Sequence, residues 1–173
     1  MQLTFDDLMN DTISDAIIDE TGQYRYSLTR LWDKKLPKLV FLMLNPSTAD
    51  HSENDPTIRR CINFAKNWGF GSIEVVNLFA FRATNPKELL TCDDPIGEDN
   101  DIYIKASLED AGLVIAAWGT KGNLFKRNEQ VIEILSNQNI YCLSLTKEGH
   151  PKHPLYIKSN EKPKEFITAS TLF

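Results

Sequence analysis

The sequence predicts an α/β protein built as a single three-layer domain, in which a central, mainly parallel sheet of four strands lies between helices. Two observations lead to this prediction. Apolar, strand-like segments alternate with amphipathic, helix-like segments along most of the chain, which is typical of right-handed βαβ units. The length of 173 residues suits one domain, and no repeat, low-complexity tract or Pro/Gly-rich linker divides residues 1–173.

The first segments predict an addition to this sheet. In residues 1–20 acidic and apolar residues intermingle, which favours a short amphipathic helix. Residues 24–32 alternate with a period of two and predict a half-buried strand or hairpin arm. Residues 39–44 are apolar on both faces, as expected for a central strand that is covered on each side.

A helix is predicted to begin at Pro56, directly after Asp55, because proline suits the first helical position. Its apolar residues share one face, and Gly69 and Gly71 end it. These apolar residues are Ile58, Cys61, Ile62, Ala65 and Trp68.

The second half of the chain continues the alternation. Residues 73–79 predict the second strand of the central sheet, and a helix is expected around residues 98–110. Residues 113–118 predict the third strand, residues 123–136 a helix, and residues 140–145 the fourth strand.

The net charge of −5 is unevenly distributed. Residues 1–20 and 88–101 hold 12 of the 24 acidic residues and no lysine or arginine, so the remainder has 19 basic residues against 12 acidic ones. A phosphate-bearing ligand therefore remains compatible with the sequence. Tight non-specific binding to duplex DNA would need a clearer basic stripe.

Several classes of protein are disfavoured. The three cysteines are widely spaced without a CxxC pair, and neither a calcium loop nor an HExxH motif is present, so we expect no metal and no cofactor. No apolar run approaches the roughly 20 residues of a membrane span, and the acidic N-terminal segment does not resemble a signal peptide. We expect a cytoplasmic protein without a membrane partner, and its oligomeric state stays open.

Polar residues follow each of the four predicted central strands. Ligands of parallel sheets bind outside the carboxyl ends of the strands, so these residues predict a binding site. They are Asn45, Pro46, Ser47 and Thr48 after the first strand, Asn77 and Arg82 after the second, Gly119 and Lys121 after the third, and His150 and His153 after the fourth.

Most of these residues also have a purely structural interpretation. Residues 45–48 are turn formers, yet they would present an amide and hydroxyls to the site. Asn77 lies in an apolar run and must find partners, either the nearby backbone or the edge of a nucleobase. Arg82 either pairs with an acid of residues 93–101 or binds a phosphate. Residues 119–122 precede the predicted helix 123–136, whose N-terminus would favour an anion.

Four runs of the sequence resemble a widespread, functionally uncharacterised bacterial and phage domain family: FLMLNPSTAD, DPTIRR, VVNLFAFRAT and GHPKHPLY. The resemblance covers nearly the whole chain and implies no activity. The same runs, in the same order, are distantly similar to the uracil-DNA glycosylase superfamily. That similarity implies the fold of these enzymes and a hydrolase that cleaves N-glycosidic bonds.

The glycosylase resemblance assigns roles to individual residues. The LNPS turn is similar to the Asn-Pro turn of mismatch-specific members, which gives Asn45 the role of orienting the hydrolytic water. Asn77 would read the base edge, with Arg82 at the N-x4-R spacing of some members. His153, in a late His-Pro motif, would stabilise the departing base. Only Phe64 or His51 could replace the aromatic residue that stacks on the base in that family.

These observations leave three functional hypotheses. The first is a protein that recognises a nucleobase or nucleotide and hydrolyses its N-glycosidic bond. The second is a non-catalytic module that binds a nucleobase or nucleotide in a phage or host regulatory or defence setting. The third is an interaction protein whose site is vestigial.

Overall fold

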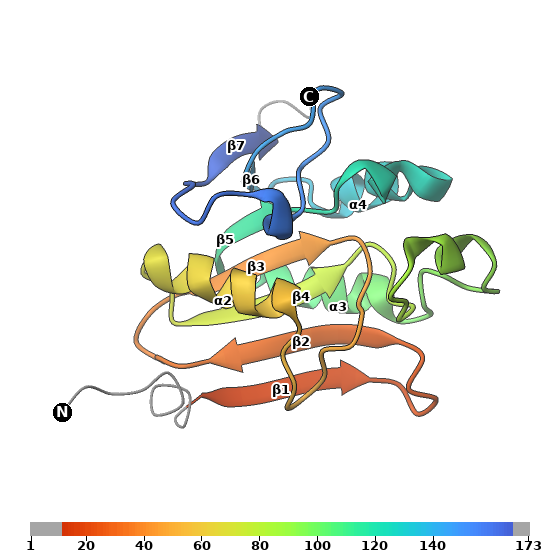
Figure 1. Ribbon diagram of the computed structural model, residues 1–173, viewed down its shortest axis with the longest axis horizontal. Helices are drawn as coiled ribbons and strands as arrows, with labels where there is room; N and C mark the ends of the chain where they lie inside the picture. Colours follow the sequence, from red (N-terminus) through yellow and green to blue (C-terminus); the bar gives the residue numbers. More distant parts are fainter. Residues whose placement is uncertain (1–11, 168–173) are drawn as a thin grey trace.

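The structure is a computed structural model that describes residues 12–167, and it is an α/β fold around one mixed sheet of seven strands (Figure 1). The sheet order is β1-β2-β4-β3-β5-β6-β7. The strands are β1 (Ile13–Ile18), β2 (Arg25–Leu31), β3 (Lys38–Met43), β4 (Ser72–Asn77), β5 (Ala111–Ala116), β6 (Ile140–Cys142) and β7 (Lys164–Ile167).

The middle of the sheet is parallel and its edges are antiparallel. Strands β4, β3, β5 and β6 pair in parallel, whereas β1 and β2 on one side and β7 on the other pair antiparallel. The carboxyl ends of β3, β4 and β5 therefore lie at the same end of the sheet. The amino end of β2 lies there too, because β2 runs antiparallel to β4.

Helices cover both faces of the sheet, because the parallel strands are apolar on both sides. Leu39 and Phe41 of β3 pack in the cluster under α2 (Pro56–Asn67). Val40 and Leu42, which alternate with them, pack in the opposite cluster with Ile104 of α3 (Asn100–Leu108) and Val131 of α4 (Arg127–Ile134). The described residues also form the short 3-10 helices η1 (Pro86–Leu90), η2 (Thr120–Lys126) and η3 (Pro154–Tyr156).

Helix α2 begins where the sequence predicts. The Asp55 carboxylate accepts a hydrogen bond from the Ile58 N–H at 2.9 Å, and Pro56 occupies the first turn. This cap satisfies one of the N–H groups that a helix start leaves unpaired. The amphipathic face of α2 is buried as expected, with Ile58, Cys61 and Ile62 all at most 2 % exposed.

Three arginines hold the loop between β3 and α2, which in Figure 1 runs across β2 towards β1 before it returns to α2. Arg82 donates to the carbonyl oxygens of Ser47 and Thr48, Arg25 to that of Ala49, and Arg30 to those of Asp50 and Glu53. Arg30 is completely buried, and it also bonds the Asn54 side chain and the Asp15 carbonyl of β1. The loop thus obtains from guanidinium groups the partners that a sheet or helix would otherwise provide.

The structure corrects three features of the predicted fold. The sheet is wider and more mixed than predicted: the strand expected over residues 24–32 joins it as β2, and β1 and β7, which were not predicted, extend it further. Ile13–Ile18 form strand β1, not part of an amphipathic helix, because β2 offers them an edge to pair with. The rest of that predicted helix, residues 1–11, lies outside the described residues. The helix expected over residues 123–136 is broken, since Phe125 and Lys126 at the end of η2, directly before α4, adopt positive φ angles of 55° and 56°.

We expect Asp55→Ala to lower the free energy of unfolding by about 1 kcal/mol, because the cap of α2 is lost. Asp55→Asn, whose amide oxygen can still accept from Ile58, should retain most of it. Urea unfolding of both variants, beside the exposed control Asp93→Ala, measures the effect. Equal stability of Asp55→Ala and wild type would show that the cap contributes nothing.

Candidate functional site

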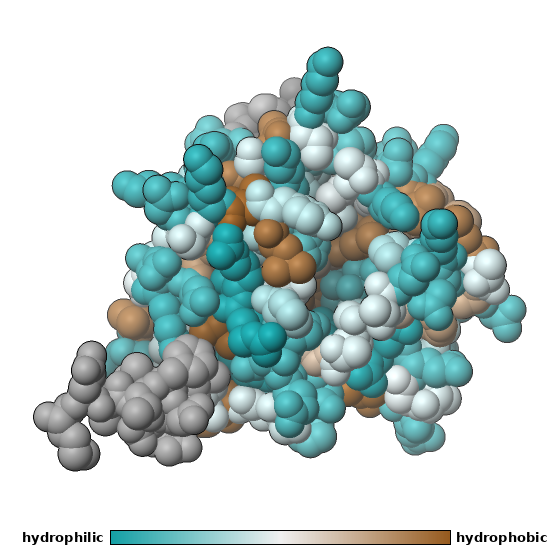
Figure 2. Space-filling view, in the orientation of Figure 1, coloured by the Kyte–Doolittle hydropathy of each residue, from teal (hydrophilic) through white to brown (hydrophobic). Residues whose placement is uncertain are grey.

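A cavity of about 570 Å³ opens where β3, β4 and β5 end. Its volume falls in the range of roughly 300–1,000 Å³ that small-molecule sites occupy. Buried side chains, among them Arg25, Asn77 and Trp118 at 2 % exposure each, form its inner end. Figure 2 shows this side of the molecule hollowed to the right of its centre, with hydrophobic residues inside a mainly hydrophilic rim.

Asn45 lies two residues after the end of β3, in the wall of the cavity. Its side-chain Nδ2 donates to the carbonyl oxygens of Ala83 at 2.8 Å and Pro46 at 3.1 Å. Since both partners are acceptors, the NH₂ group must face them, which fixes the orientation of the amide. The amide oxygen Oδ1 is then the group that Asn45 can offer to a water or a ligand.

Asn77 ends β4 and is 2 % exposed at the inner end of the cavity. Its Oδ1 accepts from Arg25 Nη2 at 3.5 Å, a long contact, whereas its buried Nδ2 has no partner among the described residues. A buried amide donor without a partner costs about 1–3 kcal/mol. Asn77 therefore keeps an unused hydrogen-bond donor beside the cavity.

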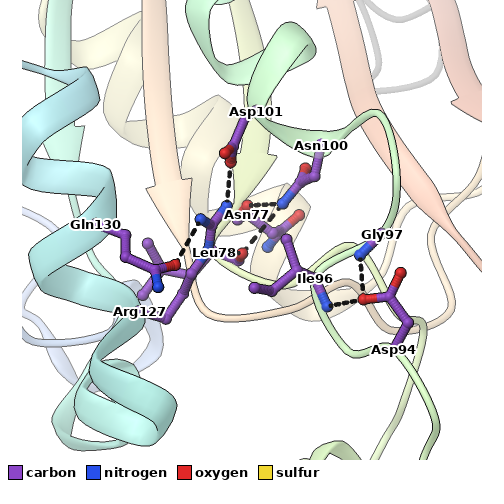
Figure 3. A network of polar contacts seen from close by, with 9 residues as sticks. All are labelled: Asn77, Leu78, Asp94, Ile96, Gly97, Asn100, Asp101, Arg127 and Gln130. Carbon is purple, nitrogen blue, oxygen red and sulfur yellow. Dashed lines mark hydrogen bonds and ion pairs between the residues drawn. The ribbon is translucent and has the colours of Figure 1, made fainter.

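Polar side chains of α3 and α4 hold the backbone at the end of β4 (Figure 3). Asn100 donates to the carbonyl oxygens of Asn77 at 2.9 Å and Leu78 at 3.1 Å. Arg127, 1 % exposed, donates to the Leu78 carbonyl at 2.8 Å and forms an ion pair with Asp101 at 2.5 Å. These contacts satisfy the backbone where β4 leaves the sheet, so the Asn77 side chain is not needed to cap it.

His153 borders the cavity at the start of η3. Its Nδ1 accepts from the Leu155 N–H at 3.3 Å, so the proton of the neutral ring resides on Nε2. Burial lowers the pKa of His153 below its ordinary value of 6.5, against an opposing effect of the Asp55 charge. The site thus holds a neutral imidazole with an Nε2–H donor at neutral pH.

The charges around the cavity are mainly positive. Arg25, Lys121 and Lys152 line it, whereas Asp55 is the one acidic residue in its described lining. The Asp55 carboxylate is already engaged with the N-terminus of α2. An anion is therefore the favoured type of ligand for this cavity.

The segment after β5 does not form the helix N-terminus that the sequence suggests. Gly119 has a φ of 74° and donates its N–H to the Pro151 carbonyl at 2.7 Å. The following η2 is a short 3-10 helix that ends in the break before α4. A Cβ on Gly122 would meet the Trp118 ring, so a residue without a side chain is required there. The backbone of this segment shapes the cavity wall beside Lys121.

Seven of the ten residues predicted for the site line this cavity. They are Asn45, Pro46, Ser47, Asn77, Gly119, Lys121 and His153. Thr48, Arg82 and His150 are not among the lining residues. Arg82 forms no ion pair with an acid of residues 93–101 and does not line the cavity. It donates instead to the carbonyl oxygens of Gly22, Ser47 and Thr48.

Two residues of the site were not predicted from the sequence: Arg25, and an aromatic residue at the mouth of the cavity. Arg25 reaches the site because β2 runs antiparallel, so that the amino end of β2 meets the carboxyl ends of the parallel strands.

The two aromatic residues considered from the sequence do not line the cavity. Phe64 is buried in the core on α2, and His51 is not among the lining residues. Tyr156, 82 % exposed, lines the cavity instead and contacts the His153 ring at 6.0 Å between centroids. The pattern GHPKHPLY already places this tyrosine three residues after His153.

Fold and site together define an α/β protein with a ligand-sized cavity at the carboxyl ends of its parallel strands. A model of the family described as "Protein of unknown function (DUF1643)" matches residues 25–155, and the chain belongs to this family. Comparisons with curated proteins and with solved structures give no match.

Two further searches cover the described residues 12–167. None of their helices combines the length and the apolar character that a membrane crossing requires. They also contain no group of three or more His, Cys, Asp or Glu side chains that could hold a metal ion.

We expect Arg82→Gln to lower the free energy of unfolding by about 1–3 kcal/mol, because carbonyl groups of the loop after β3 lose their donor. Lys87→Gln, which removes an exposed cation, is the matched control. Thermal and urea unfolding report the change. A stability equal to that of Lys87→Gln would contradict a scaffolding role for Arg82.

His153 should make stability depend on pH. The pKa of His153 is lower in the folded protein than in the unfolded chain. Below pH 6.5 the unfolded chain therefore binds a proton at His153 while the folded protein still holds this ring neutral. Stability should therefore be complete above pH 6.5 and fall as the pH drops towards the native pKa. His153→Asn, which keeps an acceptor for the Leu155 N–H, should show a smaller fall between pH 7.5 and 5.5. An NMR titration that gives His153 a pKa of 6.5 or more would overturn this expectation.

Proposed function

We propose that the protein binds a nucleobase-containing ligand in this cavity and hydrolyses its N-glycosidic bond. One observation carries the proposal: Asn45, Asn77 and His153 come from three separate segments of the chain and line one cavity. Each offers a different group, an amide oxygen from Asn45, an unpaired amide N–H from Asn77 and an Nε2–H from His153. A nucleobase edge combines acceptors and donors that match such a set.

The three groups suit a dissociative cleavage. The bond between the sugar carbon and the base nitrogen breaks first, and its electron pair leaves with the base. Asn77 holds the base edge, and the neutral His153 donates from Nε2 to the developing anion. The Asn45 amide oxygen orients a water that attacks the cationic sugar carbon, and the proton of that water passes to solvent. No strong base is required, because the sugar is already electron-poor.

The likeness to uracil-DNA glycosylases is part of this proposal. Its support is the parallel arrangement of β4, β3, β5 and β6, together with the positions of the Asn-Pro turn after β3, Asn77 at the end of β4 and His153 after β6. Tyr156 offers an aromatic surface at the mouth of the cavity for stacking on the base.

A non-catalytic binding module is the second candidate. The observation that favours it is that the described lining of the cavity holds no free carboxylate, since its one acidic residue, Asp55, caps α2. An amide orients water without accepting its proton, so it is a weaker catalyst than a carboxylate. The binding groups of Asn77 and His153 serve this candidate equally well.

The experiment is a panel of oligonucleotides that contain uracil, hydroxymethyluracil or hypoxanthine, together with free nucleosides and nucleotides. Base release and binding are measured on the same samples. We expect Asn45→Ala to slow base release about 100-fold, because the water loses its orientation, and to leave affinity within a few-fold. Asn63→Ala, an exposed amide on α2, is the control and should match wild type.

Each outcome selects one function. Base release that Asn45→Ala removes supports the glycosidase. Binding by wild type without release supports the binding module, and release that survives Asn45→Ala removes Asn45 from the mechanism. Failure to bind any member of the panel at millimolar concentration leaves the third hypothesis, an interaction protein with a vestigial cavity.

A further inference from the structure

Arg25 is a buried cation that has no ion pair with any carboxylate of residues 12–167. It is 2 % exposed and lines the inner end of the cavity. Its guanidinium donates to the Ala49 carbonyl at 3.1 Å and to Asn77 Oδ1 at 3.5 Å, and its Nε–H has no partner among the described residues. Among the ion pairs of the described residues, none involves Arg25.

The other buried arginines of this protein are satisfied differently. Arg127 has an ion pair with Asp101, and Arg30 has five hydrogen bonds that use all three of its nitrogens. Arg25 has neither arrangement, and burial lowers its pKa to about 10. Removing a charge from water is strongly unfavourable unless a counter-charge or a full set of hydrogen bonds replaces the water. Arg25 is the buried arginine whose compensation is incomplete.

A ligand in the cavity can supply the counter-charge that Arg25 lacks. Asp55 attracts Arg25 at longer range, but it lies beyond ion-pair distance and caps α2. Lys121 and Lys152, which line the cavity as well, add to the positive potential. Asn77, in contact with Arg25, supplies a second unused donor at Nδ2. A cation and a neutral donor side by side are the groups that bind an oxyanion.

We propose that Arg25 and one N–H of the Asn77 amide form an oxyanion subsite at the inner end of the cavity, so that the ligand bears a phosphate or a carboxylate next to the base edge that the other N–H of Asn77 binds. This inference deepens the proposed function and rests on it only for the nucleobase part of the ligand. Two sources fit the same chemistry: the phosphate of a free nucleotide, or an acidic substituent on the base itself. The subsite makes a neutral nucleoside a poorer ligand than either.

The first test observes Arg25 in the wild-type protein and needs no variant. In ¹H–¹⁵N spectra we expect the Nε–H signal of Arg25 to shift when inorganic phosphate is added at constant ionic strength. The Nε–H of Arg82, which is bonded to the Ser47 carbonyl, is the internal control and should stay in place. An Arg25 signal that moves no more than that of Arg82 at millimolar phosphate overturns the phosphate arm.

The second test compares four ligands by calorimetry: uridine, uridine monophosphate, uracil and 5-carboxyuracil. Tighter binding of the monophosphate than of uridine identifies a nucleotide phosphate, and tighter binding of 5-carboxyuracil than of uracil identifies an acidic base. Arg25→Gln should remove about 10- to 100-fold of that preference. Lys105→Gln, which removes an exposed cation on α3 outside the cavity lining, is the control. If Arg25→Gln does not fold, Lys121→Gln and Lys152→Gln should each reduce the preference a few-fold, and the loss should shrink at high salt.

The outcomes separate the two proposals. If charged and neutral ligands bind equally well and the Arg25 signal stays still, the subsite is wrong while the proposed function stands. If phosphate shifts the Arg25 signal but no base-containing ligand binds or is cleaved, the subsite stands and the proposed function is wrong. If neither phosphate nor 5-carboxyuracil binds, the subsite is wrong whatever the nucleosides do.

Discussion

The site depends on how the backbone of the loop between β3 and α2 is satisfied. The loop leaves the sheet and crosses β2, and carbonyl groups along it accept hydrogen bonds from Arg25, Arg30 and Arg82. Unpaired carbonyl groups in such a place would destabilise the fold. Because guanidinium groups have several donors in a rigid plane, three side chains fix a long irregular segment.

This loop sets the geometry of both the wall and the inner end of the cavity. At one end it places Asn45, whose amide is oriented by the carbonyl of Ala83. At the other end it delivers Asp55 to the start of α2. Arg25 belongs to the same clamp and lines the cavity, so the scaffold and the proposed oxyanion subsite share one side chain. A ligand that engages Arg25 would therefore also act on the loop that carries Asn45.

The mixed sheet brings the groups of the site together. In a purely parallel sheet, a residue at the beginning of a strand lies far from the carboxyl ends where ligands bind. Strand β2 runs in the opposite direction, so Arg25, its first residue, reaches the edge where Asn77 ends β4. Asn100 and Arg127 satisfy the end of β4 from the other face, which leaves the Asn77 side chain available to the cavity.

The sequence by itself determined the buried central strands, the start of α2 at Asp55 and the cluster of polar residues that includes Asn45, Asn77 and His153, because these follow from local apolar periodicity and capping. It did not determine β1 or β7, since edge strands depend on a partner far along the chain. The role of Arg82 and the entry of Arg25 into the site were decided by tertiary structure alone. A guanidinium group has no local pattern that reveals its partner, and only the folded chain places it beside a carbonyl, a carboxylate or a cavity.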